Sequence, residues 1–263
     1  MTLIDPTPAD LAVASLLYGA VVGLSLKEGL GVEKSLTVAA LRMGVQLFFV
    51  GYLVRFLFGV ERWYVVTGAL FLMSLYAARA GVARMKRPVP GLWGPMWIGV
   101  FGGTLFTTAV VTQGVLKLDP WYAPEGLIPL GGMILGNAMN GGALAADRLH
   151  AELKARRDEI EALLALGLTY PRAAREASRE AVRGALIPTV NSMLTVGIVH
   201  LPGIMVGQML GGADPVTAAK YQFVIMLMVA ASVSLTAALF VKRGLAVYFT
   251  GAHQLRHELF GEK

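Results

Sequence analysis

Long apolar stretches separated by short polar segments run through most of the chain. A membrane-crossing helix needs about 20 mostly apolar residues, and seven stretches reach that length. They cover approximately residues 9–26, 36–58, 63–80, 94–116, 125–146, 185–208 and 219–241. The fifth and sixth are interrupted by proline and glycine, so they are the least regular. The pattern predicts an all-α polytopic membrane protein with about seven transmembrane helices.

The composition agrees with this prediction. Of the 263 residues, 56% are AVILMFWYC and only 15% are charged, whereas soluble domains carry about 25% charge. This excludes a soluble enzyme, a disordered chain and a disulfide scaffold. The chain has no cysteine, which removes thiol nucleophiles, cysteine-based zinc sites and iron–sulfur clusters. The net charge is +6, but no basic cluster is combined with stacking aromatics, so no nucleic-acid partner is expected.

The lysines and arginines predict an orientation in the membrane. If the N-terminus lies outside, 18 of the 23 basic residues fall on the inner side, four fall outside and Arg42 lies within the second stretch. Basic residues favour the cytoplasmic side. We therefore expect a multi-pass protein of the inner (plasma) membrane, with Met1 outside and Lys263 in the cytoplasm.

One polar segment, residues 147–184, dominates the predicted cytoplasmic side. Its acidic and basic residues nearly balance, and apolar residues recur at helical spacing over 149–164, which predicts an amphipathic helix. Gly167 is expected to end this helix, and Pro171 suits the first turn of another. A second helix is therefore predicted over about 171–184.

The second predicted helix has two contrasting faces. Arginines occupy one side, and the opposite side is small. The small side is formed by Ala173, Ala174, Ala177 and Ala181. A short helix of this kind suits docking into a groove of another protein. The alternative is a solvated helix lying on the bilayer surface.

The same segment resembles a known motif. Glu161-Ala162, then Gly167, then Ile187-Pro188 is similar to the EAA loop of ABC-transporter permeases, although Leu163 stands in place of the second alanine. In that loop a coupling helix sits in a cleft of the ATPase subunit. The resemblance implies that 147–184 is a coupling segment. Its expected coupling residues are Glu161, Gly167, Ala173, Ala174, Arg175 and Ala177.

Longer runs resemble one permease family more closely. PLGGMILGNAMNGGALAADRLHAE, EIEALLALGLTYPRAA and ALIPTVNSMLTVGIVHLPGIMVGQMLGGADPVTAAKYQ are similar to FetB-type permeases. That family pairs with a separate ATPase and is linked to iron export in bacteria; a plant relative is linked to aluminium tolerance. The resemblance implies a single permease domain over 1–263, with an importer-like core of five helices after two added spans. It also implies a second copy of the chain in the transporter.

The chain contains no G-x-x-x-x-G-K-[ST] motif, which is the phosphate-binding loop of such ATPases. No catalytic residue is therefore expected here, and no cofactor is expected in this chain. If ATP drives transport, ATP and Mg are bound by the partner ATPase. The alternative function is an ATP-independent channel or secondary carrier with a regulatory partner on the cytoplasmic side.

Polar residues within the spans are candidates for a substrate pathway, because such residues are costly in a membrane. The candidates are Asn137, Asn140, Asn191, Ser192 and Gln208. Amide oxygens and thioethers can both coordinate metal, which adds Met133, Met193 and Met205. The competing interpretation is that the amides bridge helices and the methionines fill the core. No Asp or Glu falls within a predicted span, so any metal site would be weak.

Overall fold

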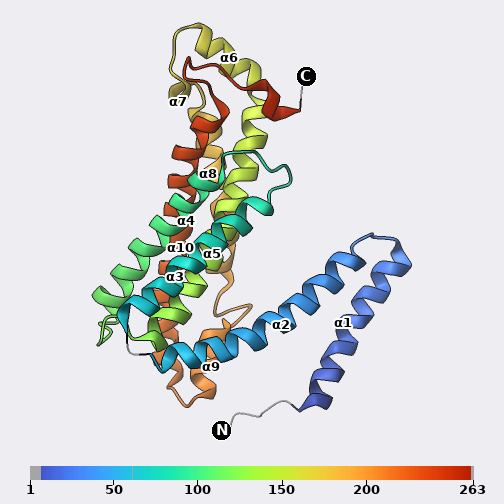
Figure 1. Cartoon of the computed structure of the whole chain (residues 1–263), viewed down its shortest axis with the longest axis vertical. Helices are drawn as coiled ribbons and strands as arrows, with labels where there is room; N and C mark the ends of the chain where they lie inside the picture. The colour runs from blue at the N-terminus through green and yellow to red at the C-terminus, as the bar shows by residue number, and fades with distance from the viewer. Residues whose placement is uncertain (1–6, 61, 262–263) are drawn as a thin grey trace. The chain divides into compact units, whose positions relative to one another are not determined.

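The computed structural model describes residues 7–60 and 62–261, almost entirely as helix (Figure 1). The α-helices are α1 (Pro8–Glu28), α2 (Glu33–Phe58), α3 (Trp63–Ala83), α4 (Trp93–Ala109), α5 (Pro124–Ala155), α6 (Arg157–Ala165), α7 (Tyr170–Ala173), α8 (Arg175–Thr195), α9 (Gly203–Leu210) and α10 (Pro215–Gly244). A π-helix, η1 (Val110–Val115), continues α4, and two 3₁₀ turns, η2 (Leu245–Tyr248) and η3 (His257–Phe260), follow α10. The all-α polytopic fold expected from the sequence is confirmed.

The described residues form two compact units. Residues 7–60 with 210–213 form one unit, and residues 62–209 with 214–261 form the other. The two added spans and the core of five helices expected from the sequence fall in the same two parts of the chain.

In the first unit, α1 and α2 are joined by a tight turn. Gly29 and Gly31 both have positive φ there, a conformation that glycine adopts without strain. Ser25 donates a hydrogen bond to Glu33 at 2.9 Å, and Tyr18 donates to the carbonyl of Leu36 at 2.7 Å. The remaining surface of both helices is mostly exposed and apolar, as expected for helices that face lipid.

Five of the seven predicted spans are confirmed as helices long and apolar enough to cross a membrane. Among the described residues these helices are Pro8–Glu28, Glu33–Phe58, Trp63–Ala83, Trp93–Val115 and Pro215–Tyr248. The fifth predicted span lies within α5, a continuous helix that is less apolar, because small and polar residues occupy much of it. The fifth predicted stretch is thus helical as expected, but α5 is not among the five described helices that are apolar enough to be counted as membrane spans by composition.

The sixth predicted span, 185–208, is wrong as a single helix. Helix α8 ends at Thr195, residues 196–202 are not helical, and α9 begins at Gly203. Gly197 has φ +82°, which stops a helix. The predicted end of the preceding helix near residue 184 is also wrong, because α8 runs without interruption from Arg175 through Pro188 to Thr195.

Helices α4 and α10 pack closely against each other in the second unit. A Cβ atom on Gly99 would lie 2.8 Å from the carbonyl oxygen of Thr236, and one on Gly103 would lie 2.5 Å from Thr236 Oγ1. Thr236 itself donates a buried hydrogen bond to the carbonyl of Gly99 at 3.1 Å. The glycines therefore let the two backbones approach, as small residues do in membrane bundles.

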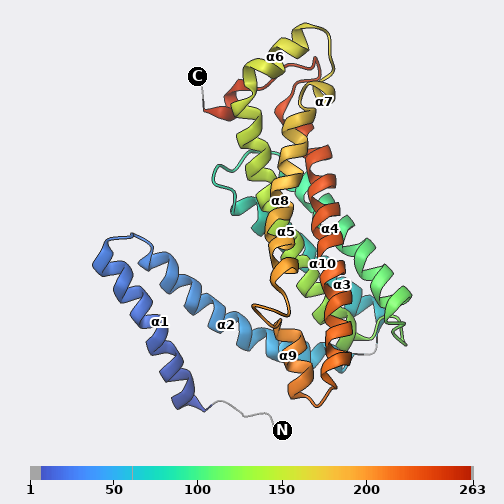
Figure 2. The same ribbon diagram turned by 180° about the vertical axis from the view of Figure 1, so that it is seen from behind.

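Helices α5, α8 and α10 lie side by side in both views of the second unit (Figures 1 and 2). At one end of this group α6, α7 and the segment that follows α10 come together (Figure 2). We call this end of the second unit, formed by α6, α7 and the segment after α10, the loop end. By the predicted orientation, the loop end is cytoplasmic.

Candidate transport cavity and coupling segment

A cavity of about 390 Å³ lies between α5, α8 and α10. Its volume falls in the range typical of small-molecule sites. Its walls combine amides, hydroxyls and methionine sulfur with small and aliphatic groups. The lining residues are Met133, Asn137, Asn140, Gly141, Leu144, Ala185, Pro188, Thr189, Ser192, Pro202, Gln222, Ile225, Met226 and Val229. We call it the polar cavity.

Helix α5 supplies much of the predicted chemistry. Met133, Asn137 and Asn140 follow one another at spacings of four and three residues, which places them on one helix face, and all three line the cavity. The Asn137 amide donates to the carbonyl of Met133 at 2.9 Å. The Asn140 oxygen accepts from Arg84 Nη1 at 2.6 Å. Arg84 immediately follows α3, so this contact joins α3 to the rim of the cavity.

Gln222 was missed by the sequence analysis. It lies in the second turn of α10, lines the cavity and is only 6% exposed. Its Oε1 atom is buried and has no hydrogen-bond partner in the part of the chain that the structure describes. A buried amide without a partner is costly. The available signal was a single glutamine near the start of a mostly apolar helix.

The other predicted pathway residues are distributed differently. Ser192 lines the cavity, whereas Asn191 points away on the exposed side of α8. Gln208 and Met205 belong to α9, outside the cavity wall, and Met193 is 37% exposed. The structure thus gathers Met133, Asn137, Asn140 and Ser192 and leaves the remaining four elsewhere.

The cavity wall contains no carboxylate. All of its polar groups are neutral amides and hydroxyls. Across residues 7–60 and 62–261, no cluster of three or more His, Cys, Asp or Glu could hold a metal ion. The site can therefore offer hydrogen bonds and weak oxygen or sulfur ligands, but not the charged ligand set of a tight cation site.

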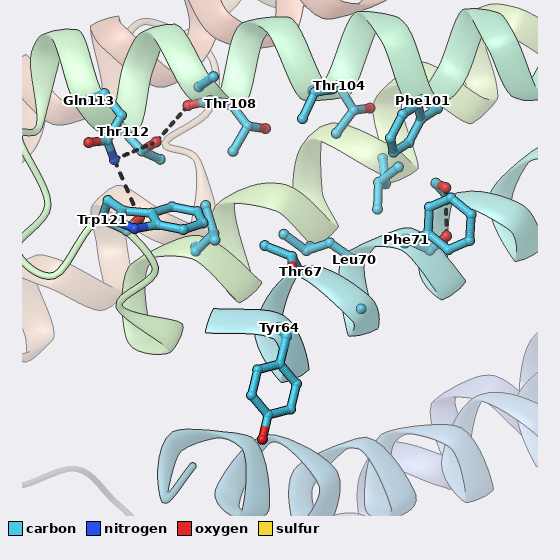
Figure 3. A pocket seen from close by; sticks show the side chains of 16 residues that line it. Tyr64, Thr67, Leu70, Phe71, Phe101, Thr104, Thr108, Thr112, Gln113 and Trp121 are labelled. Atoms are coloured by element: carbon cyan, nitrogen blue, oxygen red, sulfur yellow. Dashed lines mark hydrogen bonds between the residues drawn. The ribbon is translucent and has the colours of Figure 1, made fainter. Parts of the chain in front are cut away.

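A second cavity of about 440 Å³ lies between α3, α4, η1 and α5. Figure 3 shows Thr67, Leu70 and Phe71 on one side and Thr104 and Thr108 on the other, with Trp121 at one end. Its wall is dominated by aliphatic and aromatic groups, and Gln113 already donates to the carbonyl of Trp121 at 3.3 Å. None of the predicted pathway residues lines it, and it does not touch α8. The polar cavity is therefore the stronger candidate for a pathway.

The predicted coupling segment differs from expectation in which face is exposed. Ala173, Ala174 and Ala177 are 6%, 0% and 1% exposed and belong to the main core. The prediction that these three side chains pack in a groove of another protein is therefore wrong, because the chain's own helices already cover them. The face that remains exposed carries Arg172 and Arg175.

Gly167 ends α6 with φ +87°, so its predicted role as a helix stop is confirmed. Next to it, Leu166 is 78% exposed. This turn is the most prominent apolar point of the loop end.

The segment after α10 folds back onto the coupling segment, which the sequence analysis did not foresee. Tyr170 stacks on Phe249 with ring centroids 5.0 Å apart. Glu161 Oε1 lies 3.0 Å from His257 Nε2. His150 is packed against Phe260 at 5.2 Å, and burial, assisted by nearby Arg and Lys charges, lowers the pKa of His150. Histidine at neutral pH is therefore uncharged at this position.

A family model described as "Uncharacterised protein family (UPF0014)" matches residues 8–249. The chain belongs to the UPF0014 family. The predicted FetB-type resemblance is confirmed as well, because "Probable iron export permease protein FetB" of Escherichia coli is 31% identical and is aligned over 95% of both chains. No solved structure matches the chain.

Other UPF0014 relatives come from distant organisms. "UPF0014 membrane protein slr1647" of Synechocystis is 36% identical over 86% of this chain and 88% of the relative. "Protein ALUMINUM SENSITIVE 3" of Arabidopsis thaliana is 30% identical over 96% of this chain and 90% of the relative. Because several of the described helices are long and apolar enough to cross a membrane, the chain is a multi-pass membrane protein of this family.

Proposed function

We propose that the chain is the permease subunit of an ABC transporter that exports iron or a related metal species, driven by a separate ATPase. One observation carries this proposal: α8 begins in the coupling segment and lines the polar cavity with Ala185, Pro188, Thr189 and Ser192. One continuous helix thus joins the part of the chain that resembles an EAA loop to the group of polar side chains inside the bundle.

The exposed surface of the loop end is suited to a protein partner. Leu166 offers an apolar contact, and Arg172 and Arg175 offer charged ones. Arginine at an interface commonly contributes strongly to binding. We propose that this surface, rather than the buried alanine face, contacts the ATPase, which would bind ATP and Mg. Glu161 and Gly167 would shape the surface, Glu161 through its contact with His257.

A second copy of the chain would complete the pathway. The outward face of α8 carries Ile187, Val190, Asn191 and Leu194, all exposed. A polar amide facing lipid is costly, and a two-fold axis beside α8 would let Asn191 meet its equivalent. The pathway would then lie between two copies in the inner (plasma) membrane, with the loop ends in the cytoplasm.

The metal enters the proposal as substrate. A relative named as an iron export permease makes iron the first candidate. The amide, hydroxyl and thioether groups of the cavity would bind it weakly, which suits transport because release must be possible.

Co-purification with a stand-alone ABC ATPase tests the proposal. We expect a stable complex in nanodiscs whose ATP hydrolysis increases when iron is added. An isolated chain that moves iron without an ATPase would instead show an ATP-independent channel or carrier. If the chain forms a complex with an ATPase but no metal tested changes the rate of ATP hydrolysis, the permease assignment would stand and the metal substrate would be rejected.

Replacing Gln222 by alanine separates a pathway role from a packing role. Because its buried oxygen has no partner, the variant should keep its melting temperature or gain slightly. Loss of one hydrogen bond to substrate, worth about 1 kcal/mol, should reduce transport per folded complex roughly fivefold. Gln113→Ala, in the second cavity, is the control and should transport normally. A lower melting temperature with unchanged transport would assign Gln222 to packing.

Cysteine labelling tests the orientation, since the natural chain has no cysteine. Ala9→Cys lies on the exposed surface of α1, and Leu166→Cys replaces a side chain that is 78% exposed. In intact cells, an impermeant thiol reagent should label the first and spare the second until the membrane is opened. The reverse pattern would contradict the N-out orientation.

A further inference from the structure

A positive charge lies at the rim of the polar cavity. Arg84 Nη1 donates a 2.6 Å hydrogen bond to the side-chain oxygen of Asn140, and Asn140 lines the cavity. Arg84 and Asn140 are 56 residues apart, so the fold, rather than local geometry, brings them together. An arginine guanidinium stays protonated in proteins, so this charge is permanent.

No negative charge within the cavity offsets it. The lining residues include neither Asp nor Glu. Asp147 accepts a hydrogen bond from the backbone N–H of Lys86 at 3.0 Å and is not part of the cavity wall. A bare cation beside Asn140 would therefore meet repulsion from the Arg84 guanidinium, which lies 2.6 Å from the Asn140 oxygen.

We propose that the polar cavity takes its substrate as an anion and that Arg84 is the specificity-determining residue. This inference rests on the proposed function and names its substrate class: a metal held in a negatively charged chelate, such as a polycarboxylate complex. The neutral oxygen of Asn140, which accepts from Arg84, occupies the place that an anionic oxygen of the substrate would take.

Replacement of the Asn140 oxygen by a carboxylate oxygen on the Arg84 guanidinium is chemically favourable. A guanidinium carries five N–H donors in a planar fork, and its bonds to carboxylates are shorter and about twice as strong as those to neutral acceptors. A carboxylate oxygen of the chelate would displace the amide oxygen of Asn140. The released amide, with Asn137, Ser192 and Gln222, would then bind the remaining oxygens of the chelate.

The neutral wall fits this assignment. A chelate brings its own carboxylates to the metal, so the protein does not need to supply them. Neutral amide and hydroxyl groups can hydrogen-bond the outer oxygens of the complex without competing for the metal. The absence of Asp and Glu from the wall, which argues against a tight site for a bare cation, is then what the cavity requires.

Binding to the purified full-length chain in nanodiscs tests the inference with three probes: ferric citrate, ferrous ion under reducing conditions, and citrate alone. Arg84→Gln removes the charge, Arg84→Lys keeps it without the planar fork, and Arg79→Gln is the matched control. Arg79 lies one and a half turns earlier on the exposed surface of α3 and carries the same charge.

We expect the natural chain to bind ferric citrate more tightly than ferrous ion. Arg84→Gln should weaken chelate binding about tenfold or more, Arg84→Lys should weaken it less, and Arg79→Gln should bind normally. Unchanged folding is checked by the melting temperature of each variant. Ferrous binding should stay equal or improve in Arg84→Gln, because the repulsive charge is gone.

Other results would overturn the inference. Ferrous ion bound more tightly than the chelate, with no effect of Arg84→Gln, would reject the anion and leave a metal-exporting permease intact. Citrate alone bound as tightly as ferric citrate, with the same dependence on Arg84, would retain the anion and reject the metal. If none of the probes binds, the anion proposal is rejected. The permease assignment is tested independently by co-purification with the ATPase.

Discussion

Replacing Gly103 by leucine is expected to prevent recovery of folded protein. The first atom of the new side chain would lie 2.5 Å from Thr236 Oγ1 and 3.0 Å from the backbone oxygen of Ser232. Backbone cannot yield without separating α4 from α10. Overpacking costs about 1–3 kcal/mol in tolerant cores, and we expect the upper end of this range or more here. Yield and melting temperature in detergent measure the effect.

Gly19→Leu is the matched control. Gly19 and Gly23 have the same spacing as Gly99 and Gly103, but a Cβ on Gly19 would meet nothing within 4 Å. This variant should change the free energy of unfolding by no more than about 0.5 kcal/mol. Equal losses in the two variants would show that the close α4–α10 contact is not what makes Gly103 irreplaceable.

Two substitutions two residues apart in α8 should fail in different ways. Ala177 is 1% exposed, so Ala177→Glu would bury an uncompensated charge at a cost of about 3–5 kcal/mol and should unfold the loop end. Arg175 is exposed, so Arg175→Glu should keep its melting temperature while reversing a charge on the proposed ATPase-binding surface. We expect its affinity for the ATPase to fall about tenfold or more.

The measurements are thermal unfolding of the chain alone and binding of the ATPase to the folded fraction. Ala177→Ser serves as a mild control at the buried position. An Ala177→Glu chain that melts normally but does not bind its ATPase would restore the alanine face as the docking surface. Normal binding by Arg175→Glu would remove Arg175 from the interface.

Hydropathy predicted the simple helices well. The stretches assigned to 63–80 and 94–116 correspond closely to α3 and to α4 with η1, because a helix that faces lipid must be apolar along its length. The same rule does not apply to α5, whose polar face is turned toward the cavity. Hydropathy also overlooked the interruption after Thr195, since residues 196–202 are mostly apolar but not helical.

The candidate site was predicted in part. The spacing of Asn137 and Asn140 places them on one face whatever the tertiary fold, and both line the cavity. Gln222 and Arg84 could not be found in this way, because their positions depend on how α10 and α3 pack against α5. The alanine face was misassigned because small side chains suit a foreign groove and an internal helix contact equally well.

Because α8 is continuous from Arg175 to Thr195, a movement at one end of the helix is transmitted to the other. Proline cannot donate the helical hydrogen bond and weakens the helix at its own position. Pro188, which lies in the cavity wall, is therefore the point about which the two parts of α8 would bend. Residues 175–188 form an arm of about 20 Å at 1.5 Å per residue. A tilt of roughly 10° about that point would shift the tip by about 3 Å at this arm length. A small swing of the exposed tip would therefore reshape the wall beside Thr189 and Ser192, and a small change in the cavity would be magnified at the tip.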